Sequence, residues 1–259
     1  MKYLIILIMN KKIKIIPQIM NGINGSSDDL NALKTNLNEN KRLLNNLNHW
    51  GADNLITFGK NLSFLDDELL MQLVFKHAKH DYDKAIIWRT HILTWAAKSA
   101  SKIRGDFVEC GVHMGYTMAV ISDYVDIINL NKLYWGYDLF EGNHYSSLNI
   151  KNLNPFEFVK NQFIENNNIK LIKGSIQTSM LNTGPEKVAF LHLDLNSAAA
   201  EEAALKHFFP KLSSGALIVL DDYGWLNYKD QKDMADQFFL EKKLSVVELP
   251  TGQGIVIVN

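Results

Sequence analysis

Four aspartates follow short apolar runs of the chain, at positions where acidic side chains can bind a ligand. They are Asp138, Asp194 and the pair Asp221 and Asp222. The last three would repel one another at one site unless a cation, a proton or a basic side chain compensates them, and oxygen ligands suit Mg²⁺ or a similar hard divalent ion. The sequence therefore predicts a metal site formed by Asp194, Asp221 and Asp222. The alternative is that one of them caps a helix.

A second set of residues could bind a nucleotide-like cofactor. In the segment Glu109–Gly115, Gly111 would let the backbone approach a ligand, and Gly115 would open the following helix. Asp138 is placed to accept hydrogen bonds from both ribose hydroxyls, although a solvated or capping aspartate is the alternative. Gly174, Ser175 and Ile176 could line an adenine ring with backbone and one apolar side chain.

These residues require a sheet that brings strand ends together. Apolar runs alternate with helix-length segments at Phe107–Cys110, Leu133–Tyr137, Ile169–Ile172, Val188–Leu193 and Ala216–Leu220. This alternation predicts an α/β fold with a parallel, Rossmann-like sheet, whose ligands lie beyond the carboxyl ends of the strands. Two final runs, Leu244–Leu249 and Gly254–Val258, are joined by a Pro-Thr-Gly-Gln turn so short that they must form an antiparallel hairpin.

The N-terminal part has a different pattern. Residues 21–48 predict a loop and a polar helix, and helical spacing between Asp66 and Lys102 predicts two more helices. We divide the chain into a partly helical extension over residues 1–82, acting as a lid or an oligomer contact such as a homodimer interface, and a catalytic domain over residues 83–259. The apolar run Tyr3–Met9 is too short to span a membrane and lacks the features of a signal peptide.

Composition narrows the class of protein. The 259 residues include 27 basic and 28 acidic ones, giving a formal charge of −1, so no broad basic surface is expected to bind nucleic acid. The single cysteine, Cys110, excludes an intrachain disulfide and suits a reducing compartment. We therefore expect a cytoplasmic protein with a small-molecule substrate.

Several segments together resemble the macrocin O-methyltransferase family, in matching order from about Ile86 to Tyr223. Seven strands that end in an antiparallel hairpin are also typical of methyltransferases. The segments that carry the resemblance are Gly105–Val112, Asp138–Gly142, Phe190–Asp194, Pro210–Leu212 and Asp221–Tyr223. The resemblance implies transfer of a methyl group from S-adenosylmethionine to a hydroxyl of a sugar or small natural product, commonly with Mg²⁺. It also implies that Glu109, Gly111 and Asp138 contact the cofactor and that Asp194, Asp221 and Asp222 hold the metal.

Two positions depart from the family pattern. The family usually reads Val-Trp-Arg-Gly-Gly where this chain reads Val112-His113-Met114-Gly115-Tyr116. It tends to read Asp-x-Asp where this chain has Asp194-Leu195-Asn196, and an asparagine cannot accept a proton at neutral pH. A catalytically impaired S-adenosylmethionine-binding protein is therefore an alternative. A nicotinamide-dependent oxidoreductase is a weaker one, because His113 occupies the middle glycine position of Gly-x-Gly-x-x-Gly and leaves little room for a pyrophosphate.

The reaction would need a base that takes the hydroxyl proton, and an element that covers the molecule to be methylated. Candidate bases are Asp194, His113 and His144, and histidine has the best-matched unperturbed pKa. The helix around His91 would either form part of a lid or simply pack on the sheet. The full set of expected cofactor contacts is Glu109, Gly111, His113, Gly115, Asp138, Gly174, Ser175, Ile176 and Asp194.

Overall fold

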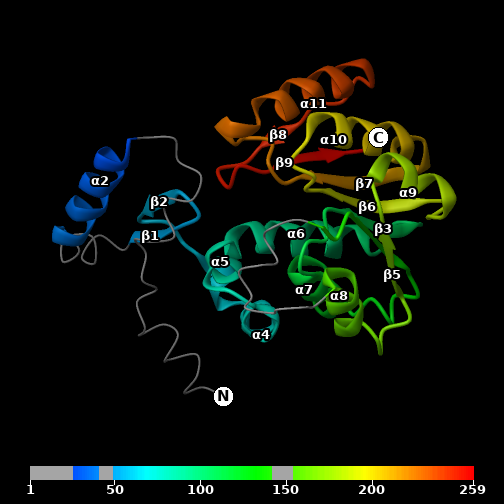
Figure 1. Ribbon diagram of the computed structural model, residues 1–259, viewed down its shortest axis with the longest axis horizontal. Helices are drawn as coiled ribbons and strands as arrows, with labels where there is room; N and C mark the ends of the chain where they lie inside the picture. The colour runs from blue at the N-terminus through cyan, green and yellow to red at the C-terminus, as the bar shows by residue number, and fades with distance from the viewer. Residues whose placement is uncertain (1–25, 41–48, 142–153) are drawn as a thin grey trace.

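A seven-stranded sheet forms the centre of the protein in the computed structural model, which describes residues 26–40, 49–141 and 154–259 (Figure 1). The strand order is β5-β4-β3-β6-β7-β9-β8; the first five strands of this order are parallel, and β9 is antiparallel to both β7 and β8. The strands are β3 (Asp106–Cys110), β4 (Tyr134–Asp138), β5 (Ile169–Lys173), β6 (Val188–Leu193), β7 (Leu212–Leu220), β8 (Val247–Glu248) and β9 (Gly254–Ile257).

Helices cover both faces of this sheet, as Figure 1 shows. Every residue of β6 is buried, because a central parallel strand packs against helices on both sides. One apolar core lies under α6 (Ile87–Ala100), α7 (Tyr116–Val125) and α8 (Pro155–Gln162). The other lies under α9 (Ile176–Asn182), α10 (Ala198–Phe208) and α11 (Lys229–Glu241).

The described residues before α6 form a hairpin and three helices. The hairpin joins β1 (His49–Ala52) to β2 (Leu55–Phe58) through Asp53 and Asn54, whose φ angles of 51° and 59° are those of a two-residue turn with left-handed backbone. Trp50 packs edge-on against Trp88 at the start of α6, with ring centroids 5.2 Å apart. The helices are α2 (Ser27–Glu39), α4 (Glu68–His77) and α5 (Asp81–Ala85), and a 3₁₀ turn spans Ser63–Asp66.

The predicted α/β fold and its antiparallel C-terminal hairpin are confirmed, with three differences in detail. Strand β8 is restricted to Val247–Glu248, the short helix α5 separates α4 from α6, and the β1–β2 hairpin was not predicted. The run Tyr3–Met9 lies outside the described residues. No helix within residues 26–40, 49–141 and 154–259 is long and apolar enough to cross a membrane. The division of the chain at residue 82 stays a prediction.

Candidate functional site

A cavity of about 750 Å³ opens at the carboxyl ends of β3, β4, β6 and β7. This edge includes the switch point between β3 and β6, where the chain changes direction across the sheet and where such folds bind ligands. The cavity is lined by Asp53, Tyr82, Arg89, Gly111, His113, Asp138, Leu139, Glu141, Asp194, Leu195, Asn196, Asp221, Asp222, Trp225, Asn227 and Tyr228. It thus brings together the predicted ribose-binding residue and all three predicted metal ligands.

Asp138 is fixed at the cavity wall by the backbone around it. Its Oδ2 accepts a hydrogen bond from the His113 backbone N–H at 2.7 Å, and its Oδ1 accepts one from Phe140 N–H at 2.6 Å. His113 and Phe140 both have left-handed φ angles, 47° and 51°, which turn these N–H groups toward the carboxylate. Each carboxylate oxygen can accept more than one hydrogen bond, so acceptor positions remain for a diol in the cavity.

Gly111 allows two strand ends to meet. It has a φ of 99°, and a Cβ atom there would lie 1.8 Å from the carbonyl oxygen of Asp194. The Asp194 N–H donates to Cys110 O at 2.8 Å, which holds the ends of β3 and β6 together. In the structure the group that closely approaches Gly111 is the backbone that carries Asp194, and the predicted approach of Gly111 to a cofactor stays a prediction.

Other residues expected to contact the cofactor do not line this cavity. Glu109 is fully buried, and its carboxylate accepts hydrogen bonds from Thr117 Oγ1 and Tyr134 OH, both at 2.5 Å. Gly115 is the N-cap of α7 and Ser175 is the N-cap of α9. Gly174 precedes Ser175, and Ile176 is buried in the apolar core. His144 lies outside the described residues.

The predicted acidic residues lie together in the structure, and one buried histidine lies beside them. Ligand atoms of His192, Asp194 and Asp221 all lie within 4.8 Å of one another, the spacing that a bound metal ion requires. Asp222 lines the same cavity, and its buried Oδ2 has no hydrogen-bond partner among the described residues. An orphaned buried carboxylate oxygen is unusual and calls for a partner.

The three carboxylates differ in how their charge is compensated. Loss of solvent, followed by repulsion from Asp221 and Asp222, raises the pKa of Asp194 well above its usual value. Burial and the Asp221 charge raise the pKa of Asp222 to about 7. Burial opposes ionisation of Asp221 too, but there Arg89 and His192 outweigh it and lower the pKa. Asp221 is thus held as a carboxylate, while the described residues give Asp194 and Asp222 no equivalent counter-charge.

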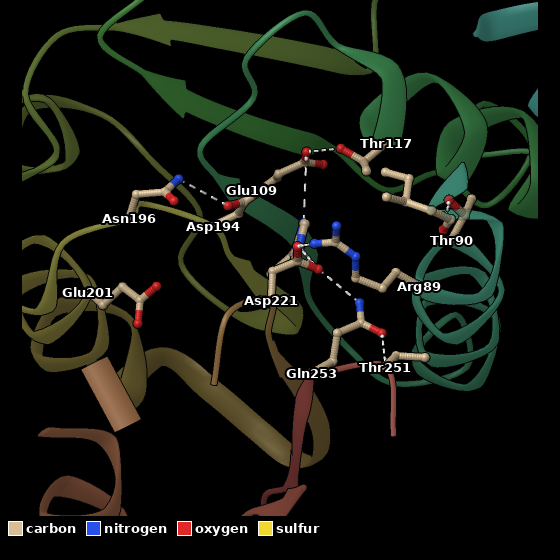
Figure 2. A network of polar contacts seen from close by, with 12 residues as sticks. Arg89, Thr90, Glu109, Thr117, Asp194, Asn196, Glu201, Asp221, Thr251 and Gln253 are labelled. Carbon is tan, nitrogen blue, oxygen red and sulfur yellow. Dashed lines mark hydrogen bonds and ion pairs between the residues drawn. The ribbon is translucent and has the colours of Figure 1, made fainter. Parts of the chain in front are cut away.

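Arg89 of α6 supplies much of that compensation (Figure 2). Its Nη1 donates to Asp221 Oδ2 at 2.6 Å, while Nε and Nη2 donate to the two oxygens of Asp53 at 2.8 and 3.0 Å. The guanidinium lies 6.0 Å from the Tyr82 ring centroid and 5.5 Å from that of Trp225. Burial alone would lower the pKa of Arg89, but its charged neighbours raise it well above the ordinary value, so the cation is permanent.

Asp221 has further partners on its other oxygen. Gln253 Nε2 donates to Asp221 Oδ1 at 2.8 Å, and Thr251 Oγ1 donates to Gln253 Oε1 at 3.1 Å, as Figure 2 shows. His192 lies between Asp221, at 3.5 Å, and Glu109, at 3.8 Å. Burial disfavours its charged form, but these two carboxylates prevail and raise the pKa of His192 to about 10.

Sequence reasoning missed several residues that line the cavity, and two buried residues that contact Asp221 behind it. The lining residues are Asp53, Tyr82, Arg89, Trp225, Asn227 and Tyr228, and the buried ones are His192 and Gln253. The helix singled out for His91 does reach the cavity, but through Arg89. His91 itself stacks on Phe64, with ring centroids 5.3 Å apart, which is a packing contact. One available signal was an arginine in this helix, between the apolar residues Ile87, Trp88 and Leu93.

Comparisons with known proteins agree with this geometry. A family model described as "Methyltransferase domain" matches residues 108–223. This segment is therefore similar in sequence to methyltransferase domains. It runs from within β3 to just beyond β7 and includes Asp138, Asp194, Asp221 and Asp222. The narrower macrocin family stays a prediction, and no curated protein sequence matches the chain.

Solved structures with a similar fold include two O-methyltransferases. The O-methyltransferase NovP superposes with a TM-score of 0.58 at 16% identity, covering 67% of this chain and 80% of its own. The calicheamicin methyltransferase CalS11 superposes with a TM-score of 0.57 at 12% identity, covering 91% of this chain and 94% of its own. At these identities the similarity establishes a shared methyltransferase fold.

Proposed function

We propose that the protein is an S-adenosylmethionine-dependent O-methyltransferase that acts on a hydroxyl of a sugar or small natural product, assisted by Mg²⁺ or a similar cation. The observation that carries the proposal is one cavity in a methyltransferase fold that holds both the backbone-anchored Asp138 and the acidic cluster. The first can bind a ribose and the second can act on an acceptor hydroxyl.

The cofactor would lie at the end of the cavity formed by Gly111, His113, Asp138 and Leu139. Asp138 would accept hydrogen bonds from the two ribose hydroxyls, as an acidic residue at this strand end does in nucleotide sites. When bound, S-adenosylmethionine supplies a methyl carbon that the acceptor oxygen takes in line while the carbon–sulfur bond breaks toward sulfur. The protein's task is then to align the acceptor and to exclude water.

The acidic cluster fits a divalent cation. Asp222 offers an unpaired buried oxygen, and the raised pKa values of Asp194 and Asp222 mean that their charged forms are unfavourable without a cation to stabilise them. Asp221 is already paired, but each of its oxygens keeps a second acceptor position. We propose that Asp194, Asp221 and Asp222 hold the ion, which would lower the pKa of the acceptor hydroxyl.

The hydroxyl proton must pass to the protein or to solvent as the new bond forms. Asp194 lines the cavity and is the first candidate, with the Asn196 amide 3.4 Å from its Oδ1. His113 also lines the cavity and is the second candidate. A base with a pKa near the working pH is favoured for this step.

The acceptor would occupy the end of the cavity formed by Tyr82, Trp225, Asn227 and Tyr228. Aromatic faces with a few polar groups suit a ring that carries hydroxyls. One structural neighbour is described as a TDP-rhamnose 3'-O-methyltransferase, which makes a sugar a reasonable first acceptor to assay.

Asn196 favours a second candidate, a protein that binds S-adenosylmethionine without turnover. The match to a methyltransferase domain disfavours the nicotinamide-dependent alternative.

A homodimer formed through the N-terminal region also stays a prediction, and light scattering after size-exclusion chromatography can test it.

The cofactor site can be tested by calorimetry with S-adenosylhomocysteine. We expect Asp138→Ala to weaken binding by about tenfold or more, because charge-assisted hydrogen bonds are lost. Asp123→Ala is a matched control, since Asp123 pairs with Lys76 and His77 on the surface. Unchanged affinity in a folded Asp138→Ala variant would remove the ribose assignment.

The metal can be tested separately by assaying methyl transfer to hydroxylated acceptors in EDTA, with Mg²⁺ or Mn²⁺ added back. We expect loss and recovery of activity. Full turnover in chelator would refute the metal site and leave the cofactor site standing, whereas binding without turnover on any acceptor would favour the second candidate.

A further inference from the structure

The turn of the β1–β2 hairpin reaches into the candidate active site through Arg89. Asp53 in this turn receives two parallel hydrogen bonds from the guanidinium, whose third nitrogen donates to Asp221. The side chains of Arg89, Asp53 and Asp221 are 7%, 7% and 8% exposed. A planar guanidinium with both edges occupied and aromatic rings nearby has little freedom to rotate.

Docking of the hairpin does not require this charged cluster. Trp50 packs against Phe64 and Trp88, with centroids 6.2 and 5.2 Å away, in a buried apolar cluster that also contains Leu70 and Val74. Apolar side chains commonly stabilise such an interface as well as a buried ion pair or better, because the ions lose their hydration. The charged cluster therefore needs an explanation beyond the attachment of the hairpin.

Asp221 and its neighbour Asp222 show what the cluster does. Asp221 is held from three directions, by Arg89, Gln253 and His192. Asp222 lies next to it in the chain, and its Oδ2 has no hydrogen-bond partner among the described residues. Arg89 thus selects one of two adjacent carboxylates and fixes its orientation, and Asp53 fixes Arg89.

We propose that Asp53 and Arg89 are positioning residues for Asp221, so that the hairpin turn is a working part of the active site. The proposal rests on the proposed function, because it assigns Asp221 to the reaction centre. Supporting residues of this kind usually change activity or metal affinity by about 10- to 100-fold when they are replaced.

The first test compares Asp53→Asn with a variant that only weakens packing. Asp53→Asn keeps the side-chain shape and removes the charge that anchors Arg89. We expect kcat to fall about 10- to 100-fold while the Kd for S-adenosylhomocysteine stays within about threefold. Val74→Ala is the control, because Val74 lies in the same apolar cluster and does not line the cavity. It should lower stability and keep kcat. Equal kcat in the two variants would overturn the proposal.

The second test needs neither cofactor nor turnover. Asp53→Asn, Asp221→Asn and the double variant form a cycle in which only the double variant leaves Arg89 without a carboxylate partner. Each variant multiplies the unfolding equilibrium constant of the unmodified protein by some factor. We expect the factor for the double variant to exceed the product of the two single-variant factors by at least about fivefold. Additive effects would overturn the proposal. If the unmodified protein binds no S-adenosylhomocysteine, the proposed function fails, and this cycle still decides whether Asp53 holds Asp221 through Arg89.

Discussion

Replacing Arg89 by methionine would leave two carboxylates buried without their cation. Methionine has a similar length and fills the space between Tyr82 and Trp225, so the main change is electrostatic. Removing one partner of a buried ion pair costs about 3–5 kcal/mol, because the remaining charge is uncompensated. Asp53 and Asp221 are 7% and 8% exposed, which places this pair in that regime.

The free energy of unfolding that Arg89→Met loses should become larger as the pH rises. In the unmodified protein burial already raises the pKa of Asp53, although Arg89 opposes this. In the variant the pKa of Asp53 rises further, and burial raises that of Asp221 above the unfolded value of about 3.9. Their folded form then binds protons more tightly than the unfolded chain, so stability is retained at low pH and lost as pH rises through the raised pKa. In the unmodified protein the pKa of Asp221 is lowered, so its contribution is present above about pH 4 and lost as pH falls. The difference between the two proteins should therefore widen from pH 5 to pH 8.

Urea unfolding followed by tryptophan fluorescence at pH 5, 6.5 and 8 measures this difference. Lys232→Met is a suitable control, because Lys232 makes partly exposed ion pairs with Asp236 and Glu248 that are worth about 0–1 kcal/mol. The reasoning would be refuted if Arg89→Met lowered the free energy of unfolding by less than about 1 kcal/mol, or by the same amount at all three pH values.

Three further outcomes follow from single residues. Gly111→Ala should cost more than about 4 kcal/mol of stability by circular dichroism, because its Cβ would lie 1.8 Å from the Asp194 carbonyl oxygen; a small loss would mean that the strand ends can separate. Asn196→Asp should raise methyl transfer by about 10² if a missing base limits the rate, and an unchanged rate would show that proton removal is not limiting. Cys110 is fully buried with a raised pKa, so an aromatic disulfide reagent should label it only after denaturation; rapid labelling of the native protein would contradict this.

The sheet and its ligand-binding edge could be predicted because both follow from local pattern. Apolar runs as continuous as that of β6 form buried parallel strands, and the acids that follow them must then share one edge. This reasoning placed Asp138, Asp194, Asp221 and Asp222 in one site. It did not anticipate the β1–β2 hairpin, although its Asp53-Asn54 turn is a recognisable signal, because each strand has only four residues.

The supporting polar network could not be predicted in the same way. Arg89 joins Asp53, 36 residues earlier, to Asp221, 132 residues later, and no periodicity relates such distant positions. Glu109 was expected at the cofactor because the family resemblance implied that contact. One more strand residue, Cys110, follows it, so its side chain belongs to the buried sheet face that also carries Phe107.

The contact between Gln253 and Asp221 makes the site depend on a residue that follows the matched segment in the chain. During synthesis Asp53, Arg89 and Asp221 emerge before Gln253, which lies on the connection into β9 beside β7. A nascent chain that has completed the match to the methyltransferase domain, residues 108–223, still lacks one of the groups that hold Asp221. The set of groups around Asp221 is therefore complete only when β9 has paired with β7.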